Sequence, residues 1–201
     1  SDGTVIAQIK TGAAQDATGN SNTASNETTS NIVMTPPTVS FNTNGNASAA
    51  KSQSTVVTAT PTSPASISAL SYQWTNSTAF PTTGTWTDFT SGSTMTQNTG
   101  TGTFYLHIQA TDNAGNSSQT TSNGFVLDNT APQTPELEAS ITTPTNGDVF
   151  VYCTYSDDSV TKEYRIGSGE WLSYPVSGCI RIASNTTVYA RGTDAAGNVS
   201  L

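Results

Sequence analysis

The fold is decided by Gly102-Thr-Phe-Tyr-Leu-His-Ile-Gln-Ala-Thr-Asp-Asn-Ala-Gly-Asn116, an apolar run that ends in a pentapeptide. The pentapeptide Asp-x-x-Gly-Asn occurs at residues 16–20, 112–116 and 194–198, so its copies begin 96 and 82 residues apart. That spacing is too long for a solenoid repeat and fits one small β-sandwich per copy. The sequence therefore predicts a tandem array of all-β units.

The composition supports folded strands rather than disorder. Charged residues make up 10% of the chain and hydrophobic residues 33%, yet three Trp, seven Tyr and six Phe remain to build cores. Disordered chains usually combine high charge with few aromatic residues. The abundant Thr favours extended backbone and keeps its hydroxyl hydrated on the solvent face of a strand. We expect an extracellular, all-β chain with a polar surface.

The net charge of −8 argues against nucleic acid as a partner, because such a protein needs a basic surface to neutralise phosphates. No apolar run approaches the roughly 20 residues that a membrane-spanning helix requires. The sequence shows no signal peptide, so we interpret it as a mature or excised segment whose export is encoded elsewhere.

Proline-bearing segments predict three parts of the chain. Residues 1–35 would be the C-terminal strands of one repeat, or a donor segment, residues 37–129 a complete sandwich, and residues 132–201 a sandwich that lacks its final strand. Pro37 and Pro132 mark the boundaries, since proline cannot donate a hydrogen bond to a central strand.

Alternating apolar residues between turn signals place the strands within these parts. In the middle part we expect strands at 38–41, 54–60, 69–75, 85–89, 95–97, 104–111 and 124–127, and in the last part at 136–140, 149–155, 162–166, 171–174, 179–183 and 187–193. Seven strands are typical of an immunoglobulin-type sandwich. Tyr72, Trp74 and Trp86 are predicted to form its aromatic core.

Several segments resemble bacterial immunoglobulin-like repeats of large cell-surface, adhesin-type proteins. They are Tyr72-Gln-Trp74, the run from Gly102 to Asn116, Leu127-Asp-Asn-Thr-Ala-Pro132, and Tyr189-Ala-Arg-Gly-Thr-Asp-Ala-Ala-Gly-Asn198. The resemblance covers nearly the whole chain. It implies tandem immunoglobulin-like β-sandwiches at a cell surface, but it implies no particular binding activity, because such folds serve many proteins.

The pentapeptide has two interpretations. It can be a hairpin turn, in which Gly takes a left-handed backbone conformation and Asp or Asn bonds nearby amides. The turn residues are Asp16, Gly19, Asn20, Asp112, Gly115, Asn116, Asp194, Gly197 and Asn198. It can also contribute oxygens to calcium, with Asp112, Asn116, Asp128 and Asn129 as candidate ligands. The turn is favoured, because each copy alone offers too few oxygens, and no other cofactor is expected.

The two cysteines, Cys153 and Cys179, both fall in the last part. In an oxidising location a disulfide between them is the first hypothesis, and its loop would stabilise the fold by about 3–4 kcal/mol. The alternative is two buried thiols. The second cysteine does not sit on the penultimate strand, as it does in antibody domains.

No catalytic constellation is present, so we expect no enzyme. His107 alternates with apolar neighbours and has no zinc-ligand cluster around it. Neither a nucleophile elbow nor a phosphate loop occurs. Trp86 and Trp171 could stack on sugars, but their matching positions in two repeats favour core packing.

Three functions remain open. The leading one is a spacer, stalk or adhesin scaffold whose partners are neighbouring repeats. A second is a fibre subunit in which residues 1–35 of one copy add a strand to the incomplete last sandwich of another. A third is a module that binds a surface glycan or a host protein through exposed aromatic rings.

Overall fold

The computed structural model describes residues 1–200 and is all-β, with seventeen strands and no helix in that range. Its contacts divide the chain into two compact units, residues 1–44, 55–95 and 106–122 in the first and residues 45–54, 96–105 and 123–201 in the second. None of the described residues forms a helix that is long and apolar enough to cross a membrane.

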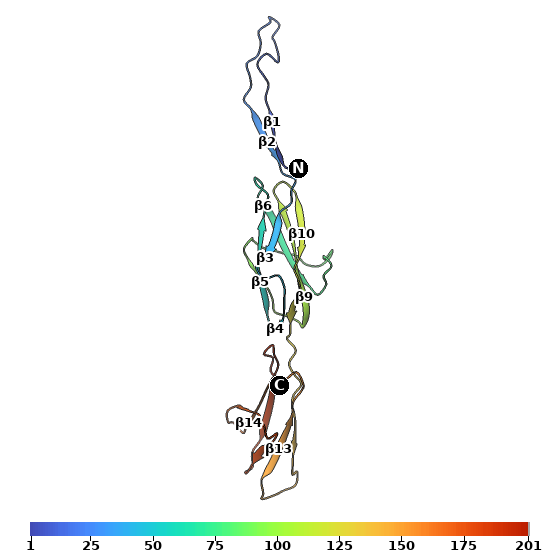
Figure 1. The fold of residues 1–201 in the computed structure, drawn as a ribbon, viewed down its shortest axis with the longest axis vertical. Coiled ribbons are helices and arrows are strands. Elements are labelled where there is room, and N and C mark those ends of the chain that lie inside the picture. Colours follow the sequence, from blue (N-terminus) through green and yellow to red (C-terminus); the bar gives the residue numbers. More distant parts are fainter. Residues whose placement is uncertain (201) are drawn as a thin grey trace. The chain divides into compact units, whose positions relative to one another are not determined.

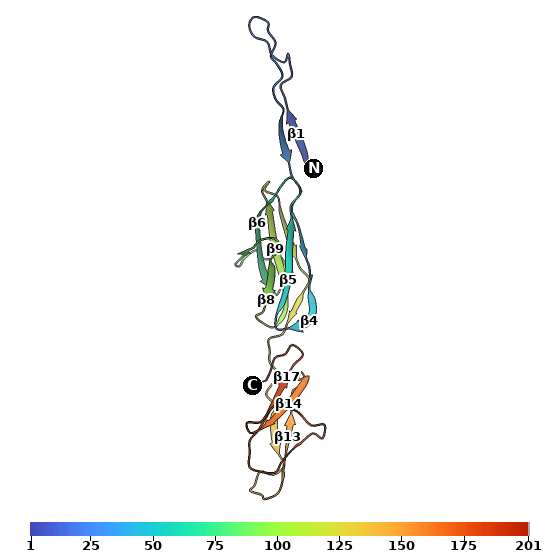
Figure 2. The same cartoon turned by 90° about the vertical axis from the view of Figure 1, so that its left-hand side faces the viewer.

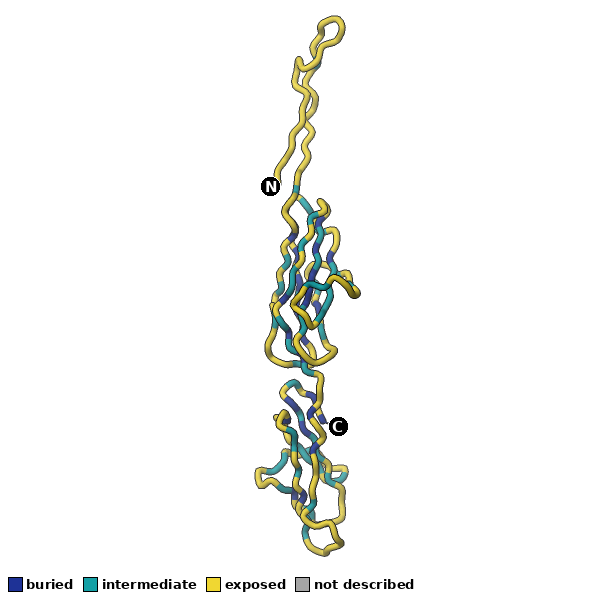
Figure 3. Tube along the Cα trace, turned by 90° about the vertical axis from the view of Figure 1, so that its right-hand side faces the viewer, coloured by how far each residue is buried: buried dark blue, intermediate teal, exposed yellow. Residues whose placement is uncertain are grey.

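The N-terminal hairpin consists of β1 (Gly3–Ala7) and β2 (Thr28–Ile32), which pair antiparallel from Gly3↔Ile32 to Ala7↔Thr28. Every residue of both strands is exposed, and the trace of these two strands is yellow in Figure 3. Exposed apolar side chains such as Val5 (50%) and Ile6 (60%) therefore lack a core of their own.

The middle sandwich consists of two facing sheets (Figures 1 and 2). Its strands are β3 (Thr38–Phe41), β4 (Asn46–Ala50), β5 (Gln53–Thr60), β6 (Ile67–Thr75), β7 (Thr87–Asp88), β8 (Thr94–Gln97), β9 (Gly102–Asp112), β10 (Ser117–Thr121) and β11 (Phe125–Leu127). One sheet has the order β3-β5-β8, and the other the order β4-β11-β9-β6-β7 with β10 also on β9. This is the arrangement of an immunoglobulin-like sandwich, and the predicted fold class is confirmed.

The core of the middle sandwich follows the alternation of β5 and β9. Val57, Leu106 and Ile108 are fully buried, and Tyr72 and Trp74 pack against them as predicted. Trp86 is not part of this cluster. It stacks on Phe80 instead, with ring centroids 5.4 Å apart, so the predicted three-ring core is wrong for this residue.

Two strands of the middle sandwich were not predicted. β4 pairs parallel with β11, and β10 extends the hairpin after β9. β4 has the sequence Asn46-Ala-Ser-Ala-Ala50, in which small residues replace the apolar alternation that marks a strand. Its extended backbone is therefore imposed by pairing with β11 rather than by its own side chains.

The last sandwich has two three-stranded sheets. Its strands are β12 (Glu136–Ala139), β13 (Val149–Thr154), β14 (Thr161–Ile166), β15 (Leu172–Ser173), β16 (Ile180–Ile182) and β17 (Val188–Thr193). The sheets have the orders β12-β13-β16 and β15-β14-β17. Val151 and Ile180 are its buried apolar side chains, whereas Leu137, on β12, is 42% exposed. The core of this sandwich is thin.

Candidate functional site: three Asp-x-x-Gly-Asn turns and the linkers they bind

Each pentapeptide closes a tight turn around the carboxylate of its Asp. In the second copy, Asp112 Oδ1 accepts bonds from the backbone N–H of Ala114 (3.0 Å) and Asn116 (2.9 Å), and Oδ2 accepts one from Asn116 Nδ2 (3.0 Å). Gly115 has φ +90°, a left-handed conformation that a side chain would strain. Asp, Gly and Asn are thus each required by the geometry of the turn.

The other two copies repeat this pattern. Asn20 donates its backbone N–H and its Nδ2–H to the Asp16 carboxylate at 3.0 and 2.8 Å, and Asn198 does the same to Asp194 at 2.8 and 2.9 Å. The φ angles of Gly19 and Gly197 are +88° and +86°.

These hydrogen bonds keep the carboxylates ionised. Bonds from Thr18 and Asn20 hold the pKa of Asp16 below its usual value, and bonds led by that of Asn116 lower the pKa of Asp112. Burial opposes the shift at Asp194, but the bonds from Asn198 outweigh it and lower the pKa. A carboxylate that accepts several N–H groups favours its charged form.

The Asn of the second and third copies also binds a linker. A primary amide has two N–H donors, and the turn uses only one of them. The remaining N–H of Asn116 bonds to the backbone carbonyl of Val33 at 3.0 Å, and that of Asn198 bonds to the carbonyl of Asp128 at 2.9 Å. We call this pair of contacts the linker latch.

The two latched carbonyls occupy matching positions. Val33 lies four residues before the buried Pro37, and Asp128 lies four residues before the buried Pro132. Val33 is the first residue after β2, and Asp128 is the first residue after β11. No unpaired residue therefore separates the end of the preceding strand from the latch.

Each linker makes further side-chain hydrogen bonds beside the latch. Asp2 Oδ1 accepts the backbone N–H of Met34 (2.6 Å) and of Thr35 (3.0 Å). Asn129 donates its Nδ2–H groups to the carbonyls of Lys51 (3.2 Å) and Gly100 (2.8 Å). Each linker is thus held by the latch. Within two residues of the latched carbonyl, it is also held by the hydrogen bonds of a second side chain.

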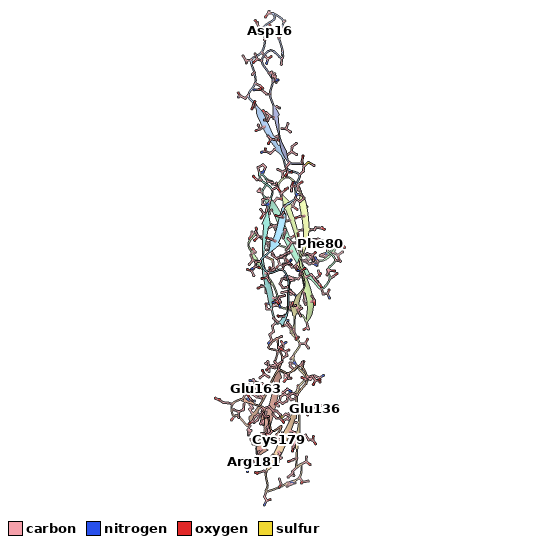
Figure 4. The ribbon with its side chains drawn as sticks, viewed as in Figure 1. Asp16, Phe80, Glu136, Glu163, Cys179 and Arg181 are labelled. Carbon is pink, nitrogen blue, oxygen red and sulfur yellow. The ribbon has the colours of Figure 1, made fainter. Side chains whose placement is uncertain are left out.

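The first turn differs in its surroundings and in its third residue, which is Thr18 where the other copies have Ala114 and Ala196. Asn20 Nδ2 bonds to Asp16 Oδ2 and to Thr18 Oγ1 (2.9 Å), so its second N–H closes on the turn itself. Asp16 is exposed at the tip of the hairpin (Figure 4), whereas Asp112 and Asp194 are 1% and 6% exposed. The pentapeptide forms the same turn with or without a bound linker.

The calcium candidates are engaged in these contacts. Asp112 and Asn116 belong to the first compact unit, and Asp128 and Asn129 to the second. Asp128 Oδ1 accepts the N–H of Thr130 at 3.0 Å, while Asp112 uses both carboxylate oxygens within its turn. Among residues 1–200 no group of three or more His, Cys, Asp or Glu side chains is arranged to hold a metal.

The two cysteines are free thiols, and the predicted disulfide is not formed. The register of β13 and β16 pairs Val151 with Ile180, which carries Cys179 to a position opposite Tyr152 rather than Cys153. Tyr174 occupies the space across from Cys153: its hydroxyl accepts the Cys153 N–H at 3.0 Å and donates to the Gly178 carbonyl. Burial raises the pKa of the Cys153 thiol.

The two candidate sugar-binding rings are both half-buried, and neither is a core residue. Trp171 lies under the guanidinium groups of Arg191 and Arg165, 4.2 and 5.0 Å from its ring centroid. Trp86 stacks on Phe80. The expected core role is therefore wrong for both rings, and other side chains already cover them.

His107 is a buried structural residue. Thr121 Oγ1 lies 2.9 Å from its Nδ1, and Thr75 Oγ1 and the Ser77 carbonyl lie 2.9 and 3.1 Å from its Nε2. Phe80 packs edge-on against the imidazole. Burial lowers the pKa of His107, which favours the neutral ring.

Comparisons with known proteins show no family for this chain. No family model matches the chain, and no curated protein matches it. Among solved structures, the fibronectin(III)-like modules of Clostridium thermocellum CbhA match over 82% of this chain and 90% of that chain, with 12% sequence identity and a TM-score of 0.33. The chain is an array of immunoglobulin-like β-sandwiches, and its resemblance to bacterial surface repeats stays a prediction.

Proposed function

We propose that this chain is a structural repeat region of an extracellular surface protein, acting as a spacer or scaffold between other domains. The linker latch is the observation that carries this proposal. A spacer needs its repeats joined by linkers that bend little, and the latch binds each linker to the sandwich that follows it.

The latch restricts the backbone of the linker and requires only one side chain of the sandwich that follows. A typical hydrogen bond contributes about 0.5–1.5 kcal/mol net, and fixing one residue of backbone costs about 1–2 kcal/mol. One bond is therefore not sufficient, but the latch, the second side chain and the buried proline act on the same few residues. Proline also reduces the freedom of the unfolded linker.

The surface of the chain suits the same role. Only 10% of residues are charged, and the polar face is built largely from Ser, Thr and Asn. The sheets have short edge strands such as β7 and β15, each of two residues, which limits pairing with other chains.

The test compares Asn198→Ala with the matched variant Asn20→Ala, which removes the same side chain from a turn that holds no linker. We expect Asn198→Ala to lower the NMR order parameters of the linker amides at 129–131 and to broaden the distance distribution across the linker, since the carbonyl of Asp128 loses its partner. Asn20→Ala should leave both unchanged. Equal linker dynamics in Asn198→Ala and the unmodified chain would remove the basis of the proposal.

A further inference from the structure

The outer face of the β12-β13-β16 sheet carries two exposed aromatic rings. Successive side chains of a strand alternate between the two faces of its sheet. On β13, Val151 is buried against the core, whereas Phe150 and Tyr152 lie on the opposite face and are 38% and 47% exposed. β13 is the central strand of this sheet, so both rings lie in the middle of its solvent face.

The corresponding sheet of the middle sandwich shows that the fold does not require such rings. Its central strand is β5, and the residues of β5 that face away from the core are Ser54, Val56, Thr58 and Thr60. Single exposed apolar residues are normal on a protein surface, whereas neighbouring large ones mark interaction sites. The aromatic face is therefore a property of the last sandwich alone.

The strand register places carboxylates beside these rings. Glu138 lies directly opposite Tyr152, and Glu136 lies opposite Thr154. Side chains that are directly opposite in an antiparallel pair share a face, with their Cβ atoms about 4.5–5.5 Å apart. Within residues 1–200, neither glutamate takes part in an ion pair, and no Lys or Arg side chain lies over the Tyr152 ring.

The one cation of this face is already neutralised. Arg181 lies opposite Phe150, and its Nε donates to Asp148 Oδ2 at 2.6 Å. The carboxylates of Glu136 and Glu138 therefore remain in excess, and the face combines exposed aromatic rings with a net negative charge.

The other sheet of the same sandwich shows what can complete this arrangement. Arg191 lies over the Trp171 ring, with its guanidinium carbon 4.2 Å from the ring centroid, and its Nε donates to Glu163 Oε2 at 2.7 Å. Glu163 is the residue directly opposite Arg191 in the strand register. A guanidinium both stacks on an aromatic face and pairs with a carboxylate. Tyr152 and Glu138 provide the same two groups without the arginine.

We propose that the outer face of the β12-β13-β16 sheet binds a basic segment of another protein, with an arginine over Tyr152 that pairs with Glu138. A second cation of the segment pairs with Glu136. The two glutamates are two residues apart on one strand, so an extended Arg-x-Arg segment presents its side chains at the same spacing. The net charge of −8 attracts a basic partner and disfavours a second copy of the chain.

The test uses the unmodified chain and synthetic peptides with blocked ends. The probe is Gly-Arg-Thr-Arg-Gly, and the matched control has Gln in place of both Arg. Binding is followed by chemical shifts of the isotope-labelled chain in about 0.1 M salt, where exposed charges more than about 10 Å apart are largely screened. We expect the probe at millimolar concentration to shift Tyr152 and Glu138. The Gln peptide should not, and about 1 M salt should weaken the binding of the probe.

Variants of the chain locate the binding on this face. Glu138→Gln should weaken the probe about two- to fivefold, as expected for an exposed ion pair, and Tyr152→Leu by a similar factor, because Leu is apolar but has no aromatic face. The matched control is Glu170→Gln, which removes the same charge from an exposed position outside this sheet and should bind like the unmodified chain.

Three results with the peptides and variants would overturn the proposal. They are no shift at Tyr152 with the probe, equal binding of the Gln peptide, and an equal loss in Glu170→Gln and Glu138→Gln. A neutral glucose oligosaccharide that shifts the same residues more strongly than the probe would assign the face to a sugar instead. Concentration-dependent shifts at Tyr152 without any peptide would assign it to a second copy of the chain.

Discussion

Replacing Asn198 by Ala tests whether the third turn contributes to stability as its geometry indicates. The substitution removes the Nδ2–H bonds to Asp194 Oδ2 and to the Asp128 carbonyl, both 2.9 Å, and leaves the backbone of the turn intact. Asn198 is 6% exposed, so water does not readily replace the lost donors. A bond to a charged acceptor contributes about 1.5–3 kcal/mol and a neutral one about 0.5–1.5 kcal/mol.

We therefore expect Asn198→Ala to lower the free energy of unfolding of the last sandwich by about 2–4 kcal/mol, out of the 5–15 kcal/mol typical of a domain. Hydrogen exchange of the most protected β17 amides measures this quantity for the last sandwich separately. The control is Asn185→Ala, at an exposed position of the same sandwich. A loss below about 0.5 kcal/mol, the range of ordinary surface substitutions, would refute the reasoning.

Three further predictions concern protonation and thiols. Hydrogen bonds to the carboxylate lower the pKa of Asp194 in the fold, so the melting temperature should fall as pH drops below about 4, and less so in Asp194→Asn. Burial lowers the pKa of His107, so acidification through about 6.5 should destabilise the middle sandwich, whereas His107→Gln should show a flat profile; an equal slope in both would contradict this. Because Cys153 and Cys179 are free, reducing agent should leave the melting temperature unchanged.

The sequence predicts those strands whose own side chains alternate between apolar and polar residues. β9 carries Leu106, Ile108 and Ala110 on one face, all fully buried, and this alternation is visible in the printed residues. β4 could not be found in this way, because its small side chains show no apolar alternation and it forms a strand beside β11. The local sequence is sufficient to predict β9, whereas β4 depends on a strand partner 79 residues away in the sequence.

The candidate site likewise has one feature that the sequence predicts, the turn, and one that it does not, the latch. The turn is predictable from Asp, Gly and Asn at fixed offsets, because these bonds join residues within four positions. The latch is not, because it joins Asn116 to Val33 across 83 residues and Asn198 to Asp128 across 70. One signal for it exists in the sequence: both acceptors lie four residues before a proline that the fold buries.

The latch explains why Asn is suited to the fifth position of the pentapeptide. Asp at this position would lack both N–H donors and would bring a second negative charge to the first, and Ser has one donor for two acceptors. Gln has the donors but adds a methylene, which displaces the amide from the position at which Asn bonds the carboxylate and the linker together. Asn closes the turn with one N–H and binds the linker with the other, so loss of Asn from this position should leave a folded sandwich with a mobile linker.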